Sequence, residues 1–560
     1  MRRWLCAWLV ALSGCHAFYM DVDGRIAQRA AEPIDIPARG PSQLPDVSQE
    51  NPAAGLVGLG LPVEPSAQKD EKQPDKGQKN AMMQRLMPSE KLVGRSVPDI
   101  VFPPAKATPQ ERDAFFKKQF APLPALPNLP LAKPGPDGKP FTLTSLQQVA
   151  LRTSPLIRQA RFDVEAARGS ALQAGLYPNP MIGYEASTAG QGDSEGNRSP
   201  GQQGGYVQQT IITAGKLKLA QLAAMREMQI AEQRRVQAEA DLQAQVRAGY
   251  FAVLAAQKNF ETAQALAELL DELYNVLYLQ MTAGEVAAYE PMQIRVLAMQ
   301  SRGVVIQAHN RYVSAWKQLA AHMGAPGLPL SAVEGRIDMP APHFEHDPVL
   351  AYVTTNHSEV IAAQVGVEKA RFQLRLAEVQ PYPDVTVQLG FQKDYTAPPF
   401  GSVANINVGI PVPFWNRNQG NIQAARAQLQ RALEDNNRVR NELTIKVAEA
   451  FERYGNNRSL LKMYQDTILP NQVQAFRAAV ARHAAVGAKD VSYNDLVTSQ
   501  QNLAGVVNAY LASLSDQWTA VVDIGHLLQT RDLFQIQPLD EVTPVPDVYE
   551  IIRDRPWRRR

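Results

Sequence analysis

The chain has 560 residues, of which 45% are hydrophobic and 7% aromatic, and its 57 basic and 55 acidic residues leave a formal net charge of +2. Because charges of both signs are mixed along the chain, no basic surface for a nucleic acid is expected. Alanine and glutamine crowd the periodic segments, which favours long, closely packed helices over one globular core.

The N-terminus has the pattern of an export signal, predicted over residues 1–15. Two arginines precede an apolar run of nine residues that ends at Leu12, too short to span a bilayer as a helix. The tetrapeptide Leu12–Cys15 resembles the lipobox of bacterial lipoproteins, which implies a covalent lipid on Cys15. The residue after this cysteine is His16 rather than Asp, which by the sorting rule for such lipoproteins favours the outer membrane as the destination. An ordinary secretory signal is the alternative.

Residues 16–140 are rich in proline: the first 140 residues hold 20 of the 41 prolines. Such a stretch cannot sustain long helices or central strands. We therefore expect an extended tether that allows one short helix around residues 109–120. The segment 532–560, which ends in three arginines, is expected to be a C-terminal tail.

The body of the chain contains one module twice, at residues 141–340 and 341–531. The motif Tyr177-Pro178-Asn179 recurs 205 residues later as Tyr-Pro-Asp at 382–384. Each copy is expected to open with a helix, over 142–176 and 347–379, which stops at prolines.

Two alternating strands are predicted to follow in each copy, at 181–188 and 206–213 and then at 385–391 and 404–412. One face of each strand is apolar and the other polar. Small soluble hairpins would show this pattern, and so would a membrane barrel with interfacial aromatic residues, which would be Tyr184, Tyr206, Tyr395, Phe414 and Trp415. Four strands are too few to close a barrel, so several chains would have to pool them.

A long helix follows the strands in each copy. No proline occurs between Pro200 and Pro291, which predicts one helix over 216–281, about 100 Å long. The second long helix, over 418–485, is expected to kink at Pro470. Each helix turns at a glycine and returns at about half the length. The predicted fold class is thus α+β and mostly α, a duplicated module of long antiparallel helical hairpins plus four strands per chain.

Three segments resemble the TolC-like outer-membrane efflux factors, and the resemblance covers about residues 142–530. They are LTSLQQVAL at 143–151, LYPNP at 176–180 and GIPVPFWNRNQGNI at 409–422. The last is most similar to the heavy-metal-resistance branch, the outer component of cobalt-zinc-cadmium and copper or silver pumps. The resemblance implies a homotrimer with a 12-stranded outer-membrane barrel and a helical tunnel in the periplasm. A periplasmic adaptor and an inner-membrane pump would be its partners, and the protein would be a passive duct without a cofactor.

The resemblance also assigns roles at the helix turns. The adaptor-facing tips would be Gly284 and Glu285 in the first copy and Val486, Gly487 and Ala488 in the second. Acidic residues just past the tips would line the periplasmic aperture, namely Glu290 and Asp495. Three positions beyond Asp495, where relatives can carry a second Asp, this chain has Thr498. Asp490 could compensate for the missing negative charge. A ring of carboxylates would favour cations in transit. The alternative for Glu290 is that it only begins a helix near its positive dipole end.

No motif of a catalytic site appears in the chain, so an enzyme is not expected. The cluster His343, His346 and Asp347, with His357 further on, suggests metal ligands, but we interpret it as a surface loop with incidental histidines. Met292 and Met299 are interpreted as packing residues. Two other functions stay open: efflux of drugs or other small molecules, including a role in type I secretion, and a periplasmic coiled-coil scaffold lipoprotein.

Overall fold

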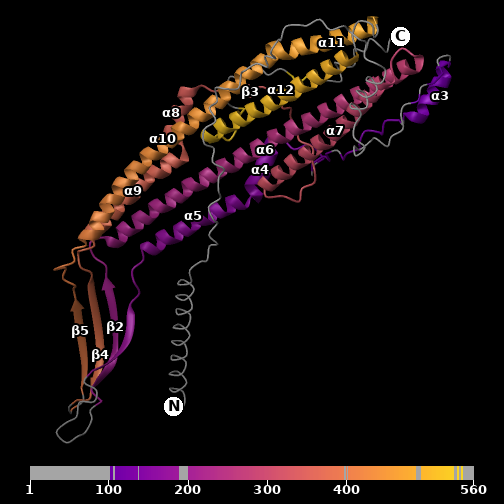
Figure 1. Ribbon diagram of the computed structural model, residues 1–560. Coiled ribbons are helices and arrows are strands. Elements are labelled where there is room, and N and C mark those ends of the chain that lie inside the picture. Colours follow the sequence, from indigo (N-terminus) through magenta and orange to yellow (C-terminus); the bar gives the residue numbers. More distant parts are fainter. Residues whose placement is uncertain are drawn as a thin grey trace, which may run out of the picture. The chain divides into compact units, whose positions relative to one another are not determined.

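The structure is a computed structural model that describes residues between 101 and 546, with gaps of which the longest are 188–199, 487–492 and 535–538. The predicted export signal and Cys15 lie outside the described residues. In Figure 1 the strands extend from the ends of the long helices, at the end of the helices opposite the turn between α6 and α7.

The four predicted strands form one antiparallel sheet in the order β1-β2-β4-β5. The strands are β1 Met181–Ser187, β2 Gln202–Ile211, β4 Val385–Asp394 and β5 Ser402–Gly409. The two copies of the module are joined by the β2–β4 pairing, in which Tyr206 lies opposite Gly390. Within the described residues, β1 and β5 each have a strand neighbour on one side only.

The helices follow the same order in both copies. The first copy has α4 Leu143–Thr153, α5 Pro155–Ala174, α6 Lys216–Ala283 and α7 Tyr289–His322. The second copy has α8 His346–Asn356, α9 Ser358–Val379, α10 Gln419–Met463, the π-helix η1 Tyr464–Ile468, α11 Leu469–Val486 and α12 Tyr493–Leu527. Among the residues that the structure describes, no helix is both long and apolar enough to cross a membrane.

Each opening helix is divided in two, which the sequence analysis did not predict. Pro155 has no N–H to continue the hydrogen-bond ladder, so α4 ends at Thr153 and a new helix starts at Pro155. In the second copy no proline stands at the break, where His357 ends α8 and caps α9 by accepting a hydrogen bond from the Glu359 N–H at 3.2 Å.

Close to Pro470, where the sequence predicts a kink, the structure has the π-helix η1, which lies immediately before α11. Pro470 cannot donate to the preceding turn, and a wider turn accommodates this loss without ending the helix. The first long helix α6 runs for 68 residues without interruption. The long helix of the second copy is therefore interrupted by a π-helix, whereas the long helix of the first copy is continuous.

The main core lies where the two copies meet, between α6, α12 and the short helices α4 and α8. Phe251 of α6 stacks on Trp518 of α12 with ring centroids 3.9 Å apart and an interplanar angle of 11°. Trp518 Nε1 donates to the Ile337 carbonyl at 2.7 Å. This buried aromatic contact therefore joins the first copy of the module to the second.

The terminal ranges differ from the predicted tether and tail where they are described. Helix α3, Pro109–Gln119, is present near the predicted position, with Thr108 and Glu111 forming a capping box. Residues 122–130 form neither a helix nor a strand, and they lie against α6 and α7. In the tail, Leu533 and Val545 are buried, and β6 Leu539–Asp540 pairs with β3 Ala341–Pro342. These segments are part of the packed body, because apolar side chains recur between their prolines and polar residues.

His357 is buried, which corrects its interpretation as an incidental surface histidine. It belongs to a polar network that joins α6, α9 and the end of α12. Gln237 Oε1 accepts from Ser358 Oγ at 2.8 Å and from Gln529 Nε2 at 2.6 Å, while His526 Nε2 lies 2.7 Å from Asp241 Oδ1. Burial, followed by the nearby His526, lowers the pKa of His357 to about 4.

This pKa predicts a loss of stability in weak acid. The pKa of His357 in the folded state lies below the usual histidine value of 6.5, so the neutral ring contributes stability above pH 6.5 that is lost as the pH falls towards 4. His357→Asn retains a cap acceptor and is expected to remove about 2–3 kcal/mol of this pH dependence. Unfolding midpoints of purified protein between pH 4 and 7 measure it, with the exposed His346→Asn as control. An unchanged pH profile in His357→Asn would contradict the assignment.

Candidate functional site

One face of the sheet carries a row of apolar side chains that crosses every strand. Ile182 lies opposite Val207, Val207 opposite Leu389, and Leu389 opposite Ile406. All four are exposed, with exposed fractions of 78% for Ile182 and 74% for Ile406. Because directly paired residues point to the same face of a sheet, they form one continuous apolar band.

The opposite face is polar. Gln208, Gln388 and Asn407 lie in one paired row, and the Gln388 side chain donates to the Glu185 carboxylate at 3.4 Å. Tyr206, predicted as part of an aromatic girdle, lies on this polar face over Gly183, where a Cβ would come 2.5 Å from the tyrosine ring. A sheet with one exposed apolar face and one polar face is suited to lie between lipid and water.

The junction of the sheet with the helices is held by Lys216, the first residue of α6. Its Nζ donates to the Tyr382 carbonyl at 2.6 Å and to Asp384 Oδ1 at 2.9 Å. The Thr213 N–H donates to the same carboxylate at 2.9 Å, and its hydroxyl to the Pro383 carbonyl at 2.6 Å. The repeated Tyr-Pro-Asp motif therefore fixes the strands of one copy to the long helix of the other.

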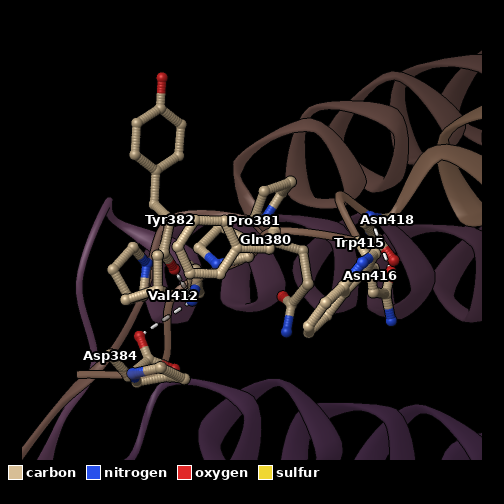
Figure 2. A pocket seen from close by; sticks show the side chains of 13 residues that line it. Gln380, Pro381, Tyr382, Asp384, Val412, Trp415, Asn416 and Asn418 are labelled. Atoms are coloured by element: carbon tan, nitrogen blue, oxygen red, sulfur yellow. Dashed lines mark hydrogen bonds and ion pairs between the residues drawn. The ribbon is translucent and has the colours of Figure 1, made fainter. Parts of the chain in front are cut away.

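Exposed aromatic residues gather at this junction. Phe414 and Trp415 follow β5, and Trp415 is 91% exposed. In Figure 2 the Tyr382 ring points away from the other labelled side chains. Tyr395 lies beyond the opposite end of the sheet, directly after β4. Aromatic residues at both ends of an apolar band match the two interfaces of a membrane.

The tip of the first helical hairpin is closed by Gly284. Its φ of 85° is left-handed and favours glycine. The Glu285 N–H bonds to the Gln280 carbonyl at 2.9 Å and the Gly284 N–H to the Met281 carbonyl at 3.0 Å, a Schellman motif. Glu285 is exposed, and Glu290 is half-buried in the first turn of α7. The predicted first tip is therefore an ordered turn.

The second tip is described only in part. Val486 ends α11, and Asp495 is exposed in the first turn of α12. Gly487, Ala488 and Asp490 lie outside the described residues. Val497 of α12 packs in one apolar cluster with Leu277 and Ile294 of the first hairpin. The structure thus brings the helix starts that carry Glu290 and Asp495 to the same end of the body.

In the histidine-rich segment between the copies, His346 is on the surface, whereas His357 is buried. His346 and Asp347 are exposed and lie 2.8 Å apart. Within the described part of the chain, no group of three or more His, Cys, Asp or Glu side chains could hold a metal ion. Met292 and Met299 are exposed in the single chain, which does not agree with packing inside one protomer.

The sequence did not reveal several residues that hold the structure together through hydrogen bonds. Lys216 gave no signal, because its partners lie more than 160 positions away. Arg302, which binds Asp271 and the Pro124 carbonyl, was missed for the same reason. One signal was available: Leu123, Leu126 and Leu129 recur every third residue, the period of a polyproline II helix.

Comparison with known proteins agrees with this geometry. The chain is 26% identical over 400 residues to the cobalt-zinc-cadmium resistance protein CzcC of Cupriavidus metallidurans, covering 70% of this chain and 90% of that protein. Among solved structures, the outer membrane protein VceC of Vibrio cholerae matches with a TM-score of 0.56 at 20% identity, over 69% of this chain and 96% of VceC. CusC matches with a TM-score of 0.59 at 17% identity, over 77% of this chain and 99% of CusC.

The open-state outer membrane channel MtrE of Neisseria gonorrhoeae has a TM-score of 0.57 at 17% identity, over 69% of this chain and 88% of MtrE. These likenesses show a shared fold of paired helical hairpins and strands. A family model described as outer membrane efflux protein matches residues 146–325 and 352–528, one range in each copy of the module. Because this model covers more than half of the chain, the chain belongs to the outer membrane efflux protein family.

Proposed function

We propose that this protein is the exit duct of a tripartite efflux system. Three chains pool their strands into a 12-stranded outer-membrane barrel, and their helices form a tunnel through the periplasm to an adaptor and an inner-membrane pump. The duct is passive, and the energy for transport is supplied at the inner membrane.

The observation that carries the proposal is the apolar row from Ile182 to Ile406, which is exposed along one face of the sheet. A soluble scaffold would leave this band in water, whereas lipid covers it in a barrel. The edge strands β1 and β5 also need partners, and pairing between neighbouring chains provides them.

Planar bilayers test the duct directly. Purified protein is expected to migrate as a heat-modifiable trimer and to open discrete ion-conducting channels. A monomer that stays in solution without detergent and conducts nothing would favour the periplasmic scaffold and sink the proposal.

The periplasmic aperture is proposed to be lined by Glu290 and Asp495. A trimer brings three copies of each carboxylate to one axis, where like charges repel unless cations bridge them. Asp495→Asn removes the charge with little change in shape, so we expect weaker block by divalent cations and a single-channel conductance raised by about twofold. Asp495→Glu is the control. Unchanged conductance and block in the asparagine variant would remove Asp495 from the aperture.

The cargo is proposed to be divalent heavy-metal cations. The support is the similarity to CzcC, whose name refers to cobalt, zinc and cadmium resistance, together with the acidic helix starts. Deleting the gene is expected to increase sensitivity to these three ions. Unchanged metal sensitivity, combined with increased sensitivity to organic drugs, would assign the duct to small-molecule efflux.

The lipid anchor on Cys15 is proposed from the lipobox pattern alone. Cys15→Ala is expected to abolish incorporation of labelled fatty acid, because no other mature residue offers the thiol that the modification needs. Labelling that persists in Cys15→Ala would contradict it.

A further inference from the structure

The N-terminal helix α3 is docked on the tip of the first helical hairpin. Phe116 and Phe120 are buried against Met281 of α6 and Ala288, the residue before α7. Tyr278 of α6 donates to the Asp113 carboxylate at 3.1 Å. Helix α3 therefore contacts both sides of the turn that Gly284 makes.

The next segment, residues 122–130, packs against both α6 and α7. Leu123, Leu126 and Leu129 are half-buried against the hairpin, while Ala125 and Asn128 are exposed. A period of three residues is that of a polyproline II helix, which places the leucines on one face.

Two buried side chains of α7 bind carbonyl groups of this segment. Arg302 is held by Asp271 of α6 through two bonds of 2.9 Å, and its Nε donates to the Pro124 carbonyl at 3.0 Å. His309 Nε2 lies 3.1 Å from the Pro130 carbonyl, to which it donates. These polar contacts fix the segment in one register along the hairpin.

The second hairpin has no counterpart of these two side chains. At the positions 205 residues later stand Val507 and Leu514, both of which are buried apolar residues. The second hairpin instead contains the π-helix η1, a feature that allows a helix to bend. Residues 108–130 also lie outside both ranges that the family model matches.

We propose that residues 108–120 and 122–130 act as an intramolecular clamp that holds α6 to α7 and fixes the Gly284 turn, so that the first hairpin of each chain is kept from moving when the tunnel mouth widens. The clamp contacts α6 and α7 at the levels of Met281, Arg302 and His309. With the clamp in place, α7 cannot shift along α6 or separate from it. The proposal rests on the channel function proposed above.

The experiment releases the clamp without changing the hairpin. The double variant Leu126→Asp with Leu129→Asp places two charges against α6 and α7, and Ala125→Asp with Asn128→Asp is the matched control at exposed positions. Trypsin cleavage after the exposed Lys118 in α3, followed by mass spectrometry, is expected to be about tenfold faster in the released variant than in the control. Single-channel conductance in planar bilayers is expected to rise by about twofold in the released variant only.

A reversible lock completes the test. Asp113→Cys with Tyr278→Cys, added to the released variant and joined by a bis-methanethiosulfonate cross-linker, is expected to restore wild-type conductance and to lose this effect when reductant cleaves the link. Faster cleavage with unchanged conductance would overturn the clamp and leave the channel intact, and so would equal cleavage in the released and control variants. Absence of channels in every variant would overturn the proposed function and the clamp with it.

Discussion

Leu389→Arg is expected to prevent assembly of the protein in the outer membrane. Leu389 lies in the apolar row between Val207 and Ile406, and an arginine on the lipid face near the bilayer midplane costs about 2–4 kcal/mol. In a trimer the cost is incurred three times, about 6–12 kcal/mol in total. The measurement is the amount of heat-modifiable trimer in isolated outer membranes.

The neighbouring residue provides a matched control. Gln388 lies on the polar face, beside the Glu185 carboxylate, so Gln388→Arg places the same charge where water and a carboxylate can receive it. Assembly close to wild type is expected. Equal assembly of the two arginine variants would contradict the assignment of the Leu389 face to lipid and of the Gln388 face to water.

Trp518→Ala is expected to have the largest effect on stability among single substitutions in the helices, about 3–5 kcal/mol. The side chain is 1% exposed, stacks on Phe251 with centroids 3.9 Å apart and donates to the Ile337 carbonyl. Its removal leaves a cavity at the point where both copies of the module meet, and an unpaired carbonyl beside it.

Thermal unfolding of the detergent-purified protein, followed by the helical circular dichroism signal, measures this loss. Trp518→Phe retains the stack but not the hydrogen bond and is expected to cost about 1–3 kcal/mol. The exposed Trp415→Ala should leave the unfolding midpoint near wild type. An unfolding midpoint for Trp518→Ala equal to that of Trp415→Ala would show that the shared core does not depend on the stack.

The sheet was predicted well because strands with one face in lipid and one in water have a period of two in the sequence. The alternation from Val385 to Phe391 placed β4 and both of its faces correctly. The absence of proline after Pro200 likewise predicted α6 nearly to its ends. Local periodicity is sufficient where the environment repeats along the chain.

The contacts of the N-terminal segment were not predicted, because they depend on tertiary partners. Proline content argued against long helices or central strands over residues 122–130, and the structure has neither there. Proline content does not reveal that Arg302 binds the Pro124 carbonyl, since the two residues are 178 positions apart. The division of the first opening helix at Pro155 was available from the sequence. It was missed because apolar periodicity continues on both sides of the proline.

The even number of strands in each chain decides how copies can close into a ring. In the order β1-β2-β4-β5 every neighbour is antiparallel, so β5 of one chain and β1 of the next also have opposite directions. Every seam of the ring then has the same hydrogen-bond geometry as the pairs inside a chain. A module with an odd number of strands would create a parallel seam at each subunit boundary. Duplication of a two-stranded hairpin avoids this mismatch for any number of subunits, and the ring size is then left to the packing of the helices.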